Sequence, residues 1–480
     1  MGVHAVNNGF SRVLLPTALL GCCLFAVCVA VFRPGYLSSS YYLGGLIFLQ
    51  VVFAALWDYR QRFVPLLLVV FLWAGMDVPF ADVWTSGRWF VLVVGAVAGF
   101  VIYAKDGHQH FGAFHLVAFF CALAALISAV VSPYPSLAVL KALSLLLLFL
   151  YGAAGARLAI VGREAKFFSG LLLGCEILVY CTTIAYFAVG LRPFGNPNSL
   201  GAVMGVAVVP LLVWGVLVSE DKTERRRRIL AFVLSLLLLF FSFARAGIVA
   251  GAVSCVLLCV ALRRYRLLIK GVSVALFSAA LIATVAPPQS GQSDSFASVF
   301  LYKGQREAGL MASRQSPWQQ TVAVIREHPW FGSGFGTSPT SDEENMPAGK
   351  YASNSKMARE HGSSYLAIAE WVGLLGVAPF FTLVLLIAVN IGRVAAWARR
   401  TGDPFSPAIP IAAVLTAGLV HTVFEDWLFA VGYYLCVFFW ALAFALVDVL
   451  PFTASATAKA SVPRAARPWA GSLGIATPGR

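Results

Sequence analysis

Three basic residues border long apolar runs, and each is of a type that can handle a phosphate group or a proton. Arg245 lies between two apolar runs, with no acidic residue within several positions. Arg314 stands four residues before Trp318 in a long polar interval, and His361 lies where that interval meets the next apolar run. Guanidinium groups bind phosphate oxygens in a bidentate manner, and an unperturbed imidazole titrates near neutral pH. The three side chains are therefore candidates for a functional site at the membrane surface, with His361 as a candidate catalytic residue.

Each of the three also has a simpler interpretation. Arg245 can extend its guanidinium to lipid headgroups, Arg314 can be a solvated loop charge, and a single interfacial histidine is commonly structural. A charge at the edge of a membrane is nevertheless costly and points to function. The polar interval also carries Trp318, Trp330 and other aromatic residues, which favour an ordered loop over a disordered one. These observations favour the functional interpretation.

A second group of polar residues could bind a ligand at the same surface. Arg192 is followed by Gly195-Asn196-Pro197-Asn198, a turn that caps a helix expected to begin near Ser199. A capped helix start explains this turn most simply, and amide side chains facing a polar ligand are the alternative. Ser363 and Tyr365 come directly after His361. The candidates for substrate contacts are Arg192, Asn196, Asn198, Ser363 and Tyr365.

The elements that must position these residues are membrane helices. The chain has 480 residues, of which 60% are hydrophobic and only 12% charged, against about 25% charged in soluble proteins. The apolar runs are continuous rather than alternating, which predicts an all-α polytopic membrane protein of about 12 to 14 transmembrane helices. The expected spans are 13–32, 40–57, 63–77, 89–104, 112–131, 138–156, 167–190, 199–218, 229–244, 246–262, 268–286, 363–391, 408–424 and 428–449.

The distribution of positive charge predicts the orientation. The net charge is +14, but the Lys and Arg clusters fall in short gaps between spans, as at Arg225–Arg228. That pattern follows the positive-inside rule and argues against nucleic-acid binding. It predicts that both termini lie in the cytoplasm and that the loop 287–360 lies on the periplasmic or extracellular side. The expected organisation is N-terminal helices 1–190, a catalytic region 191–392 that includes this loop, C-terminal helices 393–450, and a disordered cytoplasmic tail 451–480.

The long loop is expected to be partly helical. Ser316 followed by Pro317 suggests a helix N-cap and first helical residue. Metal binding is not expected: His108, His110 and His115 lie near a cytoplasmic helix end, and the outer side shows no convincing acidic cluster. Glu425-Asp426 is expected to be a solvated turn, with contact to an acceptor as the alternative.

The order and spacing of these motifs resemble the O-antigen ligase/polymerase superfamily, membrane glycosyltransferases that use lipid-linked glycans. The resemblance covers about residues 190 to 390. One departure is the three residues between His361 and Tyr365, where the family commonly has two. The motifs are Gly195–Asn198, a Ser-x-x-Arg-x-Gly hairpin at Ser242–Gly247, Arg314 ahead of Trp318, the glycine-rich stretch His328–Gly336, and His361 followed by Tyr365, Glu370 and Gly373–Gly376.

The resemblance implies a GT-C-like fold in the bacterial cytoplasmic (inner) membrane, with its active site facing the periplasm. The donor would be a polyprenyl-pyrophosphate-linked glycan, and the acceptor a hydroxyl of a glycan or lipid. Arg245 and Arg314 would hold the pyrophosphate, so that no metal or other cofactor is required. His361 would take the acceptor proton, with nearby arginines favouring its neutral form, and direct attack would invert the anomeric centre. Ligase, polymerase and protein O-glycosyltransferase remain open alternatives.

A flippase or transporter for the same lipid is the main rival. Such a protein needs charges along a central cavity across the bilayer, whereas the notable charges here gather at one face.

Overall fold

The computed structural model describes residues 40–77, 81–106, 111–285, 312–338 and 359–451, together with residues 31 and 35. The expected first span, the tail and much of the long loop lie outside these residues. The chain divides into two compact units. The first comprises Met1–His110, Leu147–Arg163 and Gly432–Ala445, and the second comprises Phe111–Leu146, Glu164–Val431 and Leu446–Arg480. Every candidate site residue belongs to the second unit.

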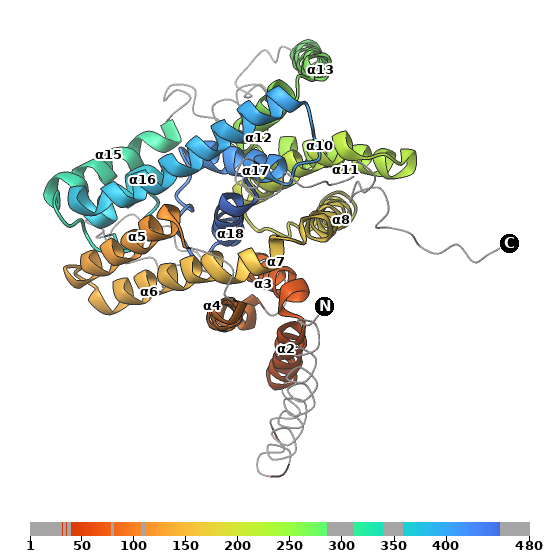
Figure 1. The fold of residues 1–480 in the computed structure, drawn as a ribbon. Coiled ribbons are helices and arrows are strands. Elements are labelled where there is room, and N and C mark those ends of the chain that lie inside the picture. Colours follow the sequence, from red (N-terminus) through yellow and green to blue (C-terminus); the bar gives the residue numbers. More distant parts are fainter. Residues whose placement is uncertain are drawn as a thin grey trace. The chain divides into compact units, whose positions relative to one another are not determined.

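The described residues form helices and no strands, which confirms the all-α fold (Figure 1). Within the described residues, six helical stretches are long and apolar enough to cross a membrane: Trp84–Lys105, Ala113–Val130, Pro135–Ile160, Glu164–Val189, Pro197–Val218 and Ser364–Thr401. The elements are α2 (Ser40–Trp57), α3 (Tyr59–Ala74), α4 (Ala81–Asp106), α5 (Ala113–Val130), α6 (Pro135–Tyr151), η2 (Gly152–Ala156), α7 (Arg157–Ile160), α8 (Glu164–Thr183), η3 (Ile184–Val189), α9 (Pro197–Ala202), η4 (Val203–Val208), α10 (Val209–Val218), α11 (Lys222–Phe241), α12 (Arg245–Ala261), α13 (Tyr265–Val285), α15 (Ala312–Glu327), α16 (Ser364–Thr401), α17 (Ala408–His421) and α18 (Tyr434–Val449).

The expected cap before α9 is confirmed: the helix begins at Pro197, two residues before Ser199, and the side chain of Asn196 accepts the backbone N–H of Asn198. The expected start of the loop helix is wrong. Helix α15 is already helical at Ala312 and contains Pro317 in its interior. Proline is tolerated at that point because the only intrahelical bond it removes is one near the start of the helix.

Close glycine contacts join the start of α9 to the hairpin that carries Arg245. A side-chain carbon added at Gly247 would lie 2.4 Å from the carbonyl oxygen of Gly201. One added at Gly205 would lie 2.1 Å from the carbonyl oxygen of Gly247. The segment α9–η4 therefore runs parallel to α12 with the two backbones in contact. This brings together two motifs that are about 45 residues apart in the sequence.

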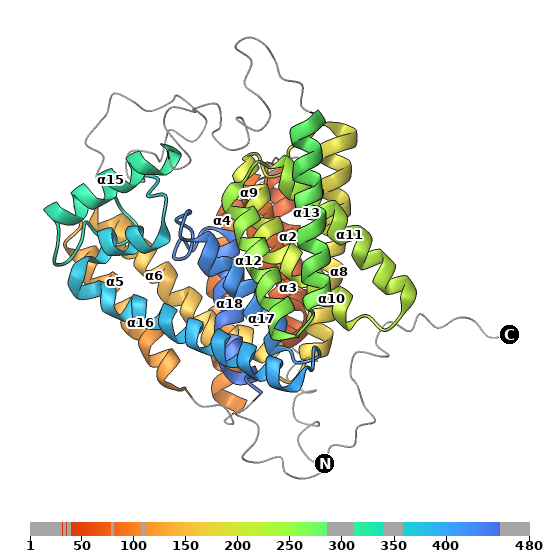
Figure 2. The ribbon, with the colours of Figure 1, turned by 90° about the horizontal axis from the view of Figure 1, so that it is seen from above.

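Helix α17 runs antiparallel to this pair, so the turn that follows α17 lies near the start of α12. The indole N–H of Trp214, near the end of α10, donates to the carbonyl of Pro404, which precedes α17 (2.9 Å). The hydroxyl of Ser254 donates to the carbonyl of Ala413 (2.7 Å). Arg245 lies nine residues before Ser254, and Thr422 lies nine residues after Ala413. Each is therefore about 13.5 Å from that contact along its helix. The start of α12 and the turn after α17 thus lie at one end of the bundle (Figure 2).

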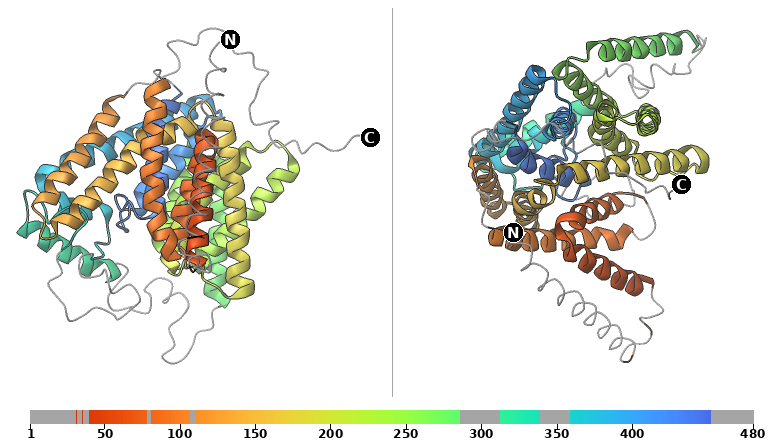
Figure 3. Two further views of the ribbon diagram at one scale, coloured as in Figure 1. Left: turned by 90° about the horizontal axis from the view of Figure 1, so that it is seen from below. Right: turned by 45° about the vertical axis from the view of Figure 1, so that its right-hand side comes forward.

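Helix α16 is broken at Gly373, which has φ 64° and ψ −176°. The expected span 363–391 is therefore two helical segments, and the second continues to Thr401. Helix α5 lies along α16 (Figures 1 and 3). The break frees backbone groups, and these find partners in the glycine-rich loop that follows α15. Ser333 N–H donates to Glu370 O (2.9 Å), and Leu374 N–H donates to Pro329 O (2.8 Å).

These hydrogen bonds satisfy backbone donors and acceptors both in the loop after α15 and at the break in α16. It also positions the site, because the loop after α15 and the first segment of α16 form one hydrogen-bonded piece.

Candidate active site

His361 lies at the centre of a buried hydrogen-bonded cluster, directly before α16. Its Nδ1 lies 3.1 Å from Oδ2 of Asp426, and the same oxygen accepts the backbone N–H of His361 (3.0 Å). Its Nε2 lies 2.7 Å from the Ser338 hydroxyl and 3.3 Å from Oε1 of Glu370. The Trp371 ring packs against the imidazole in a T-shaped arrangement. Only 2% of His361 is exposed, so these contacts fix its orientation.

The two carboxylates decide the charge of His361. Burial lowers the pKa of His361, but the hydrogen bonds and negative charges of Asp426 and Glu370 raise it by more, so the pKa lies above the usual 6.5. Burial also raises the pKa of Asp426, and the contact with His361 brings it below its ordinary value. The expectation that arginines lower the pKa of His361 is therefore wrong, because carboxylates, not guanidinium groups, contact the ring.

Arg314 binds two carboxylates at the edge of the same cluster. Its guanidinium forms ion pairs with Glu360 and with Glu425. The Glu360 side chain is 61% exposed and that of Glu425 only 19%. Burial raises the pKa of Glu425, Arg314 lowers it, and Glu360 and Asp426 raise it again, to a value of about 7. Arg314 is therefore close to His361, but its charge is already neutralised.

Trp318, one turn after Arg314, anchors α15 to the entrance of α16. Its indole N–H donates to the carbonyl of Gly362 (3.1 Å). Gly362 has φ 67°, a conformation that other residues rarely adopt, and a side chain there would lie 3.2 Å from the Trp318 indole nitrogen. The extra residue between His361 and Tyr365 is thus accommodated by a tight turn under Trp318.

Glu370 and Arg359 form a buried ion pair behind His361. The Glu370 side chain is fully buried and that of Arg359 is 11% exposed. Within the described residues, Nε and Nη1 of Arg359 have no hydrogen-bond partner. Because an unpaired buried charge is costly, this pair stabilises the cluster only while both members are present.

The residues expected to bind substrate beside His361 are used within the protein. Ser363 is 4% exposed, and it precedes the first residue of α16. The Tyr365 hydroxyl donates to the carbonyl of Leu419 (3.0 Å). The neighbouring Ser364 hydroxyl donates to the carbonyl of Glu425 (2.7 Å), which fastens the turn after α17 to α16.

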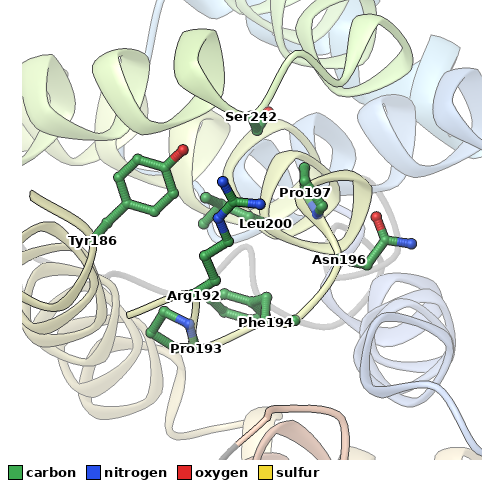
Figure 4. Close-up of a pocket in the computed structure, with 9 residues that line it drawn as sticks. Tyr186, Arg192, Pro193, Phe194, Asn196, Pro197, Leu200 and Ser242 are labelled. Atoms are coloured by element: carbon green, nitrogen blue, oxygen red, sulfur yellow. The ribbon is translucent and has the colours of Figure 1, made fainter. Parts of the chain in front are cut away.

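The remaining candidates lie on the adjoining helices. Arg245 is the first residue of α12 and is half-buried. The Asn196 side chain is used in the helix cap, where its Oδ1 accepts the backbone N–H of Asn198 (2.9 Å). Arg192 lies beside them and lines a hollow (Figure 4). His361 and Arg314 are brought together through the consecutive residues Asp426 and Glu425, which contact one of them each.

Sequence reasoning missed Glu425, Asp426, Ser338 and Arg359. Glu425-Asp426 was expected to be a solvated turn, yet these two consecutive carboxylates hold Arg314 and His361. The available signal was an acidic pair at an outer hairpin of a chain with few acidic residues. No group of three or more His, Cys, Asp or Glu residues in the described part of the chain is arranged to hold a metal ion.

Comparison with known families shows which proteins the segment around this cluster resembles. Residues 230–381 match the family model described as O-antigen ligase. This segment is similar to O-antigen ligases, and we call it the O-antigen ligase region. The resemblance seen in the sequence is thereby confirmed, and the family implies a glycosyltransferase-type activity. A search of curated proteins finds no match.

The O-antigen ligase region contains Arg245, Arg314, His361 and Glu370 but ends before Glu425 and Asp426. The cluster is therefore completed by residues outside it, from the turn after α17. With its membrane-spanning helices, the chain is a multi-pass membrane protein that contains this segment similar to O-antigen ligases.

Proposed function

We propose that the protein transfers or polymerises a glycan from a polyprenyl-pyrophosphate donor onto an acceptor hydroxyl, at the outer face of the cytoplasmic membrane. The product would be a ligated O-antigen or a longer O-antigen or exopolysaccharide chain. The observation that carries this proposal is the position of His361. It lies between Asp426 and Glu370 within the O-antigen ligase region, next to a loop arginine.

The reaction has one proton to move and one bond to exchange. The proton of the acceptor hydroxyl passes to the His361 cluster, and the acceptor oxygen attacks the anomeric carbon. The bond between that carbon and the pyrophosphate oxygen breaks, and polyprenyl pyrophosphate leaves. Attack opposite the leaving group inverts the anomeric centre. Asp426 is the more exposed neighbour of His361, with 29% of its side chain accessible, so the acceptor approaches from that side.

Arg314 and Arg245 hold the leaving pyrophosphate in this proposal. Arg314 already forms ion pairs with two carboxylates, so the pyrophosphate of the donor must displace one of them. The exposed Glu360 is the one that yields, because exposed ion pairs contribute about 0–1 kcal/mol or less. Two fixed guanidinium groups supply the positive charge that a divalent ion would otherwise provide, which supports metal independence.

The proposal is tested with purified protein, a lipid-linked glycan and an acceptor, assayed with and without excess chelator. His361→Ala should lower turnover by roughly 10²–10⁴-fold while donor binding stays intact, because a general base acts in the chemical step. Arg245→Ala should weaken donor binding as well as rate, and Arg245→Lys should restore only part of both.

Near-normal turnover of the His361→Ala variant would place the base elsewhere. Loss of activity in chelator that a divalent ion restores would contradict the role given to the two arginines.

A further inference from the structure

His421, the last residue of α17, is a buried histidine to which the proposed transfer reaction gives no role. Only 1% of the residue is exposed. Its Nδ1 accepts the indole N–H of Trp427 (2.9 Å), so Nδ1 carries no proton and the ring holds its proton on Nε2. The imidazole is therefore neutral, and it offers Nε2–H as a hydrogen-bond donor.

This donor has no partner in the part of the chain that the structure describes. The Nε2 atom is buried, and no protein atom there accepts a hydrogen bond from it. Leaving a buried donor unpaired is costly, and most buried polar groups in proteins are paired. The bond to Trp427 fixes the proton on Nε2, so His421 is suited to donate to an oxygen atom of a ligand.

His421 lies near both arginines that hold the leaving pyrophosphate in the proposed function. The positive charge of Arg314 acts on the His421 ring, which places the two side chains near each other. Helices α12 and α17 are antiparallel and in contact where Ser254 donates to Ala413 (Figure 2). His421 is eight residues after Ala413, and Arg245 is nine residues before Ser254. The histidine and Arg245 are therefore at the same level of the bundle.

We propose that Nε2–H of His421 donates to the pyrophosphate oxygen that leaves the anomeric carbon. This inference rests on the proposed function. As the acceptor oxygen forms its bond to the anomeric carbon, the bond to the leaving oxygen breaks, and the electron pair of that bond stays on the oxygen. The proton remains on Nε2. The hydrogen bond strengthens as negative charge grows on the leaving oxygen, so His421 acts mainly in the transition state.

Two substitutions of His421 separate the Nε2 donor from the contact with Trp427. In His421→Asn the amide oxygen can still accept the indole N–H, but no donor reaches the position of Nε2. In His421→Gln the longer side chain can place an amide N–H there. We expect His421→Asn to lower kcat for glycan transfer by about 10- to 150-fold, the range for a hydrogen bond to a charged group. Donor affinity should stay within about twofold of wild type, and His421→Gln should recover part of the lost rate.

His115→Asn is the matched control. His115 is also buried, and its Nδ1 likewise accepts an N–H, that of the Gly112 backbone (3.2 Å), at the start of α5. Its kcat should equal that of the wild type. Trp427→Phe is a second test, because it leaves Nε2 in place and removes the N–H that fixes the proton there. Its kcat should fall by about two- to tenfold. Thermal unfolding in detergent shows whether each variant folds.

The outcomes distinguish this inference from the proposed function. Absence of transfer by the wild type, given a lipid-linked glycan and an acceptor, would refute the proposed function itself. Where the wild type transfers glycan, a near-normal kcat in His421→Asn would overturn the inference and leave Nε2 a partner for water only. Equal losses of kcat and donor affinity would overturn it too, because they indicate uniform binding or damaged structure.

Two comparisons between variants would also count against the role of His421. The first is an equal kcat in His421→Asn and His421→Gln, and the second is an equal loss in His115→Asn. If His421→Asn does not fold, an unchanged kcat in Trp427→Phe overturns the inference by itself.

Discussion

Asp426→Asn is the substitution that most directly tests how the cluster works. A single carboxylate oxygen of Asp426 forms hydrogen bonds with the ring Nδ1 and with the backbone N–H of His361. An amide oxygen in the same place can still accept the backbone N–H, so the local fold should survive. The substitution removes one of the two negative charges that raise the pKa of His361. It therefore changes the charge state of the base while keeping most of the geometry.

The size of the effect follows from those contacts. Asp426 and Glu370 both raise the pKa of His361, so removing the negative charge of Asp426 should lower that pKa. Glu370 and its partner Arg359 remain in place. Loss of an orienting hydrogen bond to a charged group is worth about 1.5–3 kcal/mol, or roughly 10- to 150-fold in rate.

The assay is the pH dependence of glycan transfer, measured as kcat/KM from about pH 5.5 to 9. A base must be unprotonated, so the rate should rise with pH through the pKa of His361. That inflection should lie above 6.5 in the wild type, because the pKa is raised. In Asp426→Asn the inflection should move to lower pH, and the plateau should fall. Asp403→Asn, at the opposite end of α17, is the matched control.

An unchanged inflection in Asp426→Asn, with the plateau still reduced, would refute the electrostatic account and leave Asp426 a purely structural role. An inflection that moves to higher pH would refute it more directly.

The other predictions concern the elements that support the cluster. Gly373→Ala should abolish folding or activity, because an added carbon would lie 2.5 Å from backbone atoms of Trp330 and Gly332, whereas Gly392→Ala in the same helix meets nothing within 4 Å. Glu370→Gln should destabilise the protein by about 3–5 kcal/mol, since it leaves Arg359 buried and unpaired. The double variant with Arg359→Gln should recover part of that loss, as measured by thermal unfolding in detergent; equal loss in both would contradict the pairing.

The sequence predicted the fold class because the property that decides it is local. Continuous apolar runs require helices in a membrane, whatever lies beside them. The functional importance of Arg314 and His361 was inferred in a similar way, because a charge or a histidine at the end of an apolar run is conspicuous. Helix starts are harder to predict: Pro317 is typical of a first helical residue, but it lies inside α15.

The partners of the candidate residues could not be predicted, because they depend on contacts across the bundle. Asp426 is 65 residues from His361 along the chain, and the sequence around Asp426 does not indicate that it contacts a histidine. The sign of the pKa change in His361 was consequently wrong. Proximity to arginines in the sequence motifs suggested a lowered value, and two carboxylates from other elements produce a raised one.

The interlocked glycines at the break in α16 have a consequence for how such proteins can evolve. Gly332 and Gly373 each leave no room for a side chain, and the atoms in the way belong to the other motif: the backbone of Glu370 and Trp371 for one, that of Trp330 and Gly332 for the other. A substitution at either position cannot be compensated by a change at the other. The two motifs should therefore be inherited as a single unit, even though 40 residues separate them. In related chains, loss of one glycine should coincide with loss of the other.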